Sequence, residues 1–374
     1  MPAERSELSP PLSSLGSVGV SFARHWLHLR RPIASATGGN HARQLRLFAR
    51  LELADGTVGY GEAAPHITRG PTLDDVEAEA VGWLRNTPAS AVDETVIASA
   101  PPILQLALID ALARQRSLPA WKFLGLPEPP SLVQTLITYG GTPAELHAQI
   151  TAELPSAIKL KLLGDEADFE RIEAATSAFA GPLAIDVNGA WPDIDSANRA
   201  LARIENTLAG TCELLWIEQP CPPAAMTARL KTRIPIFADE AVTHPSFDWN
   251  IYDGIVIKPA AIRCTRPPPI RGLCNCILRL RAAATAGKAA IFGCHLQSSL
   301  LTAATLSLAG LTNGGYHDLD APLLIENDPC DPRIVAIHDN GNVLPPLEDF
   351  GWGTLPQSLD WATTASIPNT AKFI

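Results

Sequence analysis

Five short apolar runs in the middle of the chain each end on a charged side chain. They cover residues 157–162, 183–188, 214–220, 234–240 and 254–259. Each run has the length and the bounding residues of a buried β-strand. An unpaired ion is costly to bury, so charges repeated at strand ends indicate a site that uses them.

The spacing of these runs predicts the architecture. The strand ends recur about every 20 to 35 residues, which is the period of a βα unit with short loops. Helical patterns fill two of the intervals, at residues 169–179 and 196–208. The sequence therefore predicts an α/β fold of the TIM-barrel type, with functional groups at successive strand ends. A doubly wound sheet is the alternative, but it gathers ligand groups at one switch point rather than over five consecutive strands.

The flanking sequence predicts the remaining elements and the division of the chain. Residues 45–53 alternate in hydrophobicity, Asp55-Gly56 is a turn signal, and residues 58–65 return as the second strand of a hairpin. Further helices are expected at 72–84, 103–115, 273–286 and 300–309, and further barrel strands at 132–138, 289–298 and 315–320. We expect four regions: a disordered segment at 1–20, an α+β domain at 21–128, a barrel at 129–326 and a tail at 327–374 that packs back on the α+β domain.

Composition argues against several classes of protein. The formal net charge is −10, which does not suit a nucleic-acid surface, and no run of 18 apolar residues suggests a membrane span. The N-terminus lacks the apolar core of a signal peptide, so we expect a cytoplasmic protein. The seven cysteines are an odd number, which fits a reducing compartment. Cys274 and Cys276 lack a second pair or a nearby histidine, and we interpret them as helix residues rather than zinc ligands.

The charges at the strand ends suggest a specific chemistry. In chain order they are basic, acidic, acidic, acidic and basic: Lys161, Asp186, Glu218, Asp239 and Lys258. Three carboxylates that converge at strand ends make a site for a hard divalent cation such as Mg²⁺. Two lysines that flank this cation make a pair of acid/base groups. A lysine beside a dication and near another lysine is expected to have a depressed pKa, which makes the neutral amine available as a base.

The motifs around these residues resemble the enolase superfamily, and within it the muconate-lactonizing subgroup. The matching stretches are Lys159-x-Lys161, Asp186-Val187-Asn188, Glu218-Gln219-Pro220, Ala238-Asp239-Glu240 and Ile257-Lys258-Pro259. Residues 59–65 are also similar to that family's capping domain. Each motif alone is weak, but five in this order and at these intervals are specific.

The resemblance implies a modified (β/α)7β barrel beneath an N-terminal α+β capping domain. It implies that Asp186, Glu218 and Asp239 hold Mg²⁺, with Lys161 and Lys258 on opposite faces of the substrate. The shared reaction removes a proton α to the carboxylate of a small molecule and passes through an enediolate, whose charge a metal can offset. Lys159 is expected to neutralise the site and to orient the substrate carboxylate or a metal ligand. Enzymes of this family are often homo-oligomers.

The specificity residues leave several activities open. Asp318-x-Asp320 is similar to the pair that grips the free ammonium in dipeptide epimerases of the subgroup, which favours an epimerase of the L-Ala-D/L-Glu type. The stretches at 186–191 and 218–221 instead resemble o-succinylbenzoate synthases, whose substrate has no amine. A muconate cycloisomerase-like enzyme, an N-acylamino acid racemase and a non-catalytic binding protein on the same scaffold are further alternatives.

The chain also departs from the family's pattern. A Gly-Gly usually follows the sixth-strand lysine, but residues 261–271 form an unusual loop in which Arg263 or Arg266 could reach an anionic group. At the seventh strand, Gln297 stands where the family often has Glu, and we expect it to bind substrate. His295 is interpreted as a packed residue rather than a catalyst. Arg30 and Arg31 are either ligands of a distal carboxylate or surface arginines.

Overall fold

The computed structural model describes most of the chain. The described residues are 19–35, 39–65, 70–87, 94–208, 210–259, 272–312, 315–330, 342–343, 345 and 348–366. The segment expected to be disordered lies outside them up to residue 18, whereas Gly19 and Val20 already belong to the first strand. Arg263 and Arg266 also lie outside the described residues.

An antiparallel sheet forms the N-terminal part of the molecule. Its order is β14 (Ala362–Ser366), β1 (Gly19–Ser35), β2 (Gly39–Glu52) and β3 (Val58–Ala63). The predicted hairpin is present, and Gly56 takes a left-handed φ of 84° in its turn. Glycine suits this turn because it adopts a positive φ without steric cost. β14 brings the end of the described chain back onto β1.

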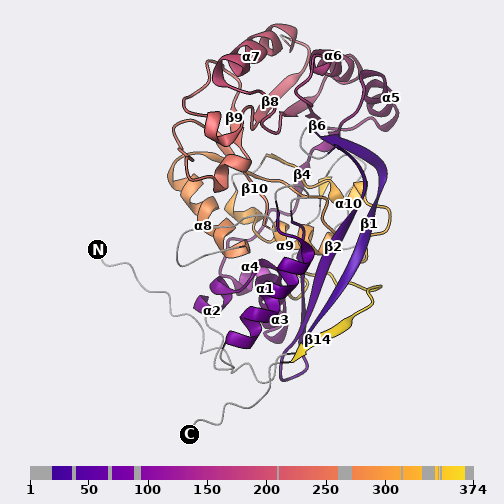
Figure 1. Ribbon diagram of the computed structural model, residues 1–374, viewed down its shortest axis with the longest axis vertical. Helices are drawn as coiled ribbons and strands as arrows, with labels where there is room; N and C mark the ends of the chain where they lie inside the picture. Colours follow the sequence, from indigo (N-terminus) through magenta and orange to yellow (C-terminus); the bar gives the residue numbers. More distant parts are fainter. Residues whose placement is uncertain are drawn as a thin grey trace, which may run out of the picture.

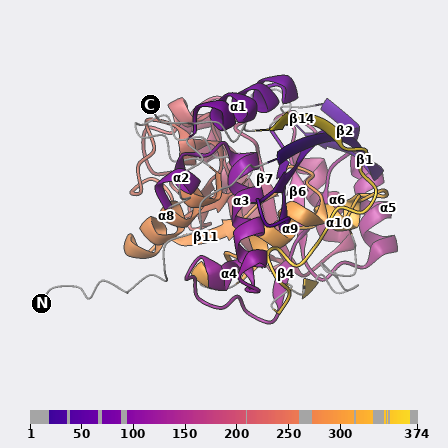
Figure 2. The ribbon, with the colours of Figure 1, turned by 90° about the horizontal axis from the view of Figure 1, so that it is seen from below.

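Two helices pack on this sheet, α1 (Leu73–Asn86) and α3 (Pro102–Gln115), and the shorter α2 (Glu94–Ser99) and α4 (Ala120–Phe123) pack on α3. α1 begins at a capping box in which Thr72 and Asp75 satisfy each other's backbone N–H groups. α3 is buried from Ile103 to Ala113, because it packs on β3 and also contacts the barrel helix α8 (Gly272–Thr285). Figure 2 shows α3 near the centre of the molecule, with α1 and α8 around it.

Seven parallel strands form the second sheet. In sheet order they are β5 (Ile137–Tyr139), β6 (Ile158–Lys161), β7 (Pro182–Asp186), β8 (Glu213–Glu218), β9 (Ile236–Ala238), β10 (Gly254–Ile257) and β11 (Ala289–Phe292). The short β12 (Tyr316–His317) pairs with β4 (Val133–Thr135), which also pairs with β13 (Asn342–Val343).

β12 joins the two edges of the curled sheet. The backbone N–H of Leu136 donates to the carbonyl of His317 over 2.7 Å, and the N–H of Asp318 donates to the carbonyl of Phe292 over 2.8 Å. These bonds place β12 between β5 and β11, so seven strands and β12 give eight positions around the ring. Together with the antiparallel sheet, this confirms the predicted α/β barrel with an N-terminal α+β part.

Most crossovers between the parallel strands are helical. The helices are α5 (Pro143–Glu153), α6 (Asp168–Ala178), α7 (Ile194–Leu208), α8 and α9 (Ser299–Leu306), and the short α10 (Ala321–Leu324) follows β12. α9 is shorter than expected, and the separate 3₁₀ turn η3 (Ala309–Leu311) follows it. Figure 1 shows α5, α6 and α7 together at the end of the molecule away from α1 and α3.

Two crossovers differ from a regular (β/α)7β pattern. In the fully described stretch 210–259, only the 3₁₀ turns η1 (Pro223–Ala225) and η2 (Glu240–Thr243) connect β8 to β9 and β9 to β10. Pro220, Pro222 and Pro223 explain the first of these, because proline removes backbone donors and clashes with a preceding turn. The barrel is therefore modified beyond what the periodicity predicted.

The remaining fold predictions have different outcomes. Cys274 and Cys276 lie in α8, as expected. Among the described residues, no helix is both long and apolar enough to cross a bilayer. The domain limits at residues 128 and 326 stay predictions.

We expect Gly61 to be required for the contact between β3 and α3. A Cβ at Gly61 would overlap the backbone carbonyl oxygen of Ile103, which cannot move without shifting the helix. Gly61→Ala should therefore lower the free energy of unfolding by about 1–3 kcal/mol or more, measured by urea denaturation. Gly82→Ala is the matched control: it lies in α1 with nothing within 4 Å of the new Cβ, and should be neutral or stabilising. Equal effects of the two substitutions would contradict this packing argument.

Candidate active site

Lys159 is the centre of the polar cluster inside the barrel. It lies on β6, is 1% exposed, and its Nζ contacts three carboxylates. The distances are 3.0 Å to Asp186 Oδ2, 2.7 Å to Glu218 Oε2 and 2.8 Å to Asp318 Oδ2. Lys159 therefore links acids from β7, β8 and the end of β12.

Lys161 and Lys258 lie on opposite sides of this cluster. Lys161 follows Lys159 by two residues, so both side chains leave the same face of β6, and its Nζ is 2.9 Å from Asp186 Oδ2. Lys258 follows β10 directly; its Nζ contacts Asp239 Oδ2 and lies 3.9 Å from Glu218 Oε1. The ring order β6, β7, β8, β9, β10 separates the two strands by four of eight positions. The two amines thus face each other across the barrel.

The three predicted metal ligands stand on consecutive strands. Asp186 ends β7 and pairs in register with Glu218 at the end of β8, while Asp239 follows β9. Asp186 and Glu218 are fully buried. Neither oxygen of Glu218 accepts a well-oriented hydrogen bond from the described residues, although both lie near lysines. An all-oxygen donor set with spare lone pairs fits a hard cation such as Mg²⁺.

The charges in this cluster are not balanced. Burial raises the pKa of Glu218, and the charge of Asp186 raises it further, despite the lysines nearby. Burial lowers the pKa of Lys258, but Asp239 and Glu218 outweigh burial and leave that pKa raised. A depressed lysine pKa, as the sequence suggested, therefore requires added positive charge to offset these carboxylates.

Two residues that the sequence analysis did not name as site candidates bond to the carboxylate-bearing residues. Gln219 has a left-handed φ of 39°, and its Oε1 accepts from the N–H groups of Asp239 and Ala241, both over 3.0 Å. Asn188, with a φ of 50°, donates its backbone N–H to Asp186 Oδ1 over 3.0 Å. Both belong to the motifs around the acids, and this proximity is the signal that could have identified them.

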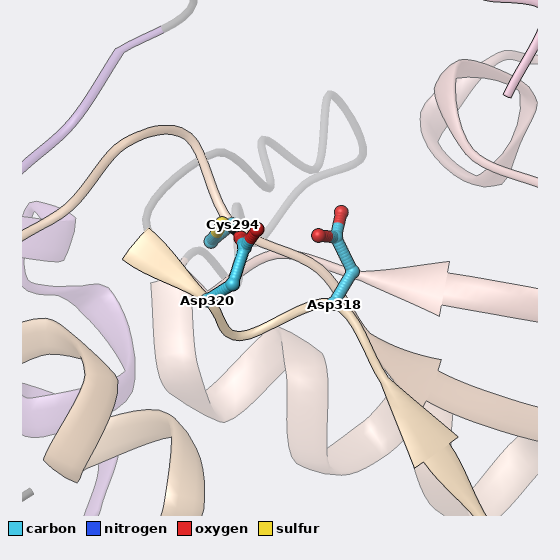
Figure 3. A group of neighbouring side chains, drawn as sticks. All are labelled: Cys294, Asp318 and Asp320. Carbon is cyan, nitrogen blue, oxygen red and sulfur yellow. Dashed lines mark hydrogen bonds between the residues drawn. The ribbon is translucent and has the colours of Figure 1, made fainter. Parts of the chain in front are cut away.

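A second acidic pair follows β12. Figure 3 shows Asp318 and Asp320 with Cys294 beside them, and ligand atoms of the three residues lie within 4.8 Å of one another. Asp318 accepts from Lys159 over 2.8 Å, and Asp320 Oδ1 has the Cys294 thiol as a weak donor at 3.9 Å. Burial raises the pKa of Asp320 to about 7, and the charge of Asp318 adds to the shift. Asp318 is already paired with Lys159, so Asp320 is the member of this pair whose surroundings favour an added positive charge.

Comparison with known proteins identifies the family. Residues 143–354 match the family described as "Enolase C-terminal domain-like", which is more than half of the chain. The chain belongs to this family. The predicted resemblance to the enolase superfamily is thus confirmed.

Relatives of this enolase-family protein carry related names. An L-Ala-D/L-amino acid epimerase from Pedosphaera parvula (strain Ellin514) is 30% identical, over 79% of this chain and 87% of that protein. A hydrophobic dipeptide epimerase from Flavobacteria bacterium (strain MS024-2A) is 27% identical, over 87% and 95%. The crystal structure of a dipeptide epimerase from Cytophaga hutchinsonii, complexed with Mg and D-Ala-L-Val, matches with a TM-score of 0.77 and 24% identity, over 93% and 99%. These relatives confirm the expected kinship with dipeptide epimerases, which are isomerases.

Other candidate residues of the enolase-family barrel have partners outside the carboxylate cluster. Gln297 is buried, and its Nε2 donates to Thr302 Oγ1 over 3.4 Å. His295 contacts the carbonyl of Ala64 over 3.3 Å, as expected for a packed residue. Arg30 donates to the carbonyl of Leu323 over 3.1 Å. The substrate-binding role of Gln297 stays a prediction.

Lys159 should contribute far more to stability than Lys161. Lys159→Met leaves three buried carboxylates without their shared cation, so we expect a loss of about 3–5 kcal/mol. Lys161→Met is the matched control on the same strand. Lys161 contacts a single carboxylate and its side chain is 20% exposed, so its loss should cost no more than about 1 kcal/mol. Urea unfolding in the presence of a chelator measures both, and equal losses would contradict this assignment.

Proposed function

We propose that this chain is a Mg²⁺-dependent dipeptide epimerase that inverts the carbon α to the substrate carboxylate, with L-Ala-D/L-Glu-type dipeptides as the first candidates. The observation that carries the proposal is the pairing of two distinct sites through Lys159. One is the carboxylate cluster flanked by opposed lysines, and the other is the buried pair Asp318 and Asp320. A dipeptide has the two complementary ends, a carboxylate and an ammonium.

Asp186, Glu218 and Asp239 would hold the Mg²⁺ ion. When bound, it would supply positive charge that stabilises the negative charge developing on the substrate carboxylate. The Mg²⁺ in the Cytophaga hutchinsonii structure supports this proposal. Gln219 accepts from the backbone N–H of Asp239, and the backbone N–H of Asn188 donates to the carboxylate of Asp186, which helps to keep these ligands oriented.

Lys161 and Lys258 would move the proton. One amine accepts the α-proton from one face of the substrate, and the opposite ammonium returns a proton to the other face, which inverts the centre. Their separation by four of eight ring positions supports this two-sided transfer. Each side chain is partly exposed, at 20% for Lys161 and 11% for Lys258, whereas Lys159 is 1% exposed.

Asp318 and Asp320 would bind the ammonium end. The substrate of o-succinylbenzoate synthase has no amine, and an anionic ligand would be repelled by these two aspartates. Muconate cycloisomerase and N-acylamino acid racemase substrates also lack a free ammonium. The acidic pair therefore favours the epimerase over the alternatives.

The remaining expectations are kept as proposals. A dipeptide is the proposed small-molecule partner, and no nucleic acid or membrane partner is proposed. A cytoplasmic location and a homo-oligomeric state stay predictions from the sequence.

The direct test is α-deuterium exchange. In D₂O with Mg²⁺, the protein should incorporate deuterium at the α-carbon of the C-terminal residue of L-Ala-L-Glu or of another dipeptide in a panel, measured by NMR. Lys161→Ala and Lys258→Ala should each slow epimerisation by at least about a hundredfold, because each removes one acid/base group. Each variant should still exchange the epimer whose α-proton faces the remaining lysine.

Lys288→Ala is the control for these lysine variants. Lys288 precedes β11 and donates to the carbonyl of Tyr252, away from the carboxylates, so its loss should leave exchange intact. No exchange with any dipeptide would overturn the proposal. Consumption of the cyclohexadiene precursor of o-succinylbenzoate, followed by its ultraviolet absorbance, would favour the synthase instead.

Mg²⁺ should stabilise the folded chain through the three carboxylates. At a concentration about a hundredfold above its Kd, a ligand that binds only the folded state adds about 2.7 kcal/mol. Asp186→Asn, Glu218→Gln and Asp239→Asn should each abolish most of the resulting rise in Tm, measured by circular dichroism at matched ionic strength. Asp248→Asn is the control, because this carboxylate accepts from the backbone and side chain of its neighbour Asn250 and lies outside the three-carboxylate set. A rise in Tm that survives all three variants would place the ion elsewhere.

A further inference from the structure

Thr138 contacts both carboxylates of the acidic pair. Its backbone N–H donates to Asp320 Oδ2 over 2.6 Å, and its Oγ1 donates to Asp318 Oδ1 over 3.2 Å. Thr138 is 4% exposed, so neither bond competes freely with water. Thr138 of β5 therefore fixes the relative position of Asp318 and Asp320, which follow β12.

Thr138 also stands beside Lys159. The two residues pair in register between β5 and β6, and both donate to Asp318: Thr138 to Oδ1 and Lys159 to Oδ2. Asp318 has both oxygens occupied by these donors. Asp320 Oδ2 accepts from the Thr138 N–H, and the donor to Oδ1 among the described residues is the Cys294 thiol at 3.9 Å. In the described part of the chain, Asp320 Oδ1 thus has the weakest donor of the four carboxylate oxygens, and we assign it to a substrate ammonium.

The N-terminal sheet reaches the same threonine. Arg31 on β1 donates to the carbonyl of Thr138 over 3.0 Å and stacks on the ring of Tyr139 at 4.3 Å. The other guanidinium nitrogen bonds Gln149 and Glu153 of α5, both over 3.0 Å. Figure 1 shows β1 running along one side of the molecule toward α5 and β6. Arg31 thus connects the antiparallel sheet β14-β1-β2-β3, which we call the capping sheet, to β5, the strand that carries Thr138.

We propose that Thr138 is a positioning residue that holds Asp318 and Asp320 in the arrangement that receives the substrate ammonium, and that Arg31 supports it from the capping sheet. This inference rests on the proposed epimerase function. In this proposal, the preference for a substrate with a free α-amino group depends on Thr138 and Arg31 as well as on Asp318 and Asp320.

The physical reason is pre-organisation. A cation binds best to carboxylates that are already oriented, because ordering them during binding subtracts from the affinity. A hydrogen bond to a charged group is stronger than one between neutral groups. Removing the Thr138 hydroxyl should therefore weaken binding of the ammonium end while leaving the lysines and the carboxylate cluster in place.

The test compares ligands with and without an ammonium. Thr138→Val keeps the shape and the backbone N–H but removes the hydroxyl, and Thr138→Ser restores it. The KM of the best dipeptide should rise roughly tenfold or more in Thr138→Val, with little change in kcat, and return toward the wild-type value in Thr138→Ser. The inhibition constant of the N-acetylated dipeptide, which has no ammonium, should not change.

Two further variants complete the design. Thr305→Val is the matched control: Thr305 is equally buried, but its hydroxyl donates to the carbonyl of Leu301 within α9. It should leave both constants unchanged. Arg31→Met removes the donor to the Thr138 carbonyl and keeps an apolar stem, so the KM should rise selectively and by less than in Thr138→Val. If Thr138→Val does not fold, Arg31→Met carries the same comparison.

The outcomes separate this inference from the proposed function. If the wild-type protein exchanges no dipeptide, the epimerase proposal fails and this inference fails with it. If the wild-type protein is active but Thr138→Val and Arg31→Met keep the wild-type KM, only the positioning role is overturned. Equal weakening of the dipeptide and its N-acetyl derivative, or a fall in kcat alone, would also overturn it.

Discussion

The barrel interior depends on one buried ammonium group. Lys159 lies within 3.0 Å of carboxylates from β7, β8 and the segment after β12, and it has almost no exposure to water. Each of these charges would be expensive to bury alone, so the four groups stabilise one another only when the strands that carry them are assembled. Lys159 therefore ties the early strands of the ring to the strand that closes it. The carboxylate cluster and the pair Asp318 and Asp320 share this one cation.

The order of strands converts positions in the sequence into positions around a ring. Because parallel strands with short crossovers follow one another, charges at successive strand ends meet at one edge of the barrel. This is why the order basic, acidic, acidic, acidic, basic in the sequence indicates the layout of the site. Asp186, Glu218 and Asp239 fall on three adjacent strands, and Lys161 and Lys258 fall on strands that face each other. Strand periodicity and end charges were enough to predict these relations.

The sequence did not predict the individual hydrogen bonds that uncharged side chains make to neighbouring strands. Thr138 lacks a charge and a motif, and its role follows only from its register with Lys159 and its bonds across the closure. Cys294 was part of a predicted strand, but its approach to Asp320 depends on how β11 ends. Gln297 follows the same strand, yet its amide turns toward Thr302 in α9 rather than toward the lysines. The prolines after Glu218 explain why a 3₁₀ turn, and no longer helix, connects β8 to β9, although the βα period predicts a helix there.

The capping sheet does more than cover the barrel mouth. Its buried Arg46 donates to the carbonyls of His295 and Leu296, and its buried Glu62 accepts from the N–H of Ser298 over 3.0 Å. Since a buried ion is tolerated only when it is bonded, these contacts fix the loop after β11 to the sheet, as Arg31 fixes Thr138. The acid/base and carboxylate groups, in contrast, are held by the barrel strands alone. Substitutions in the sheet can therefore shift Thr138 and the loop after β11 while the strands that carry Lys161 and Lys258 stay in place.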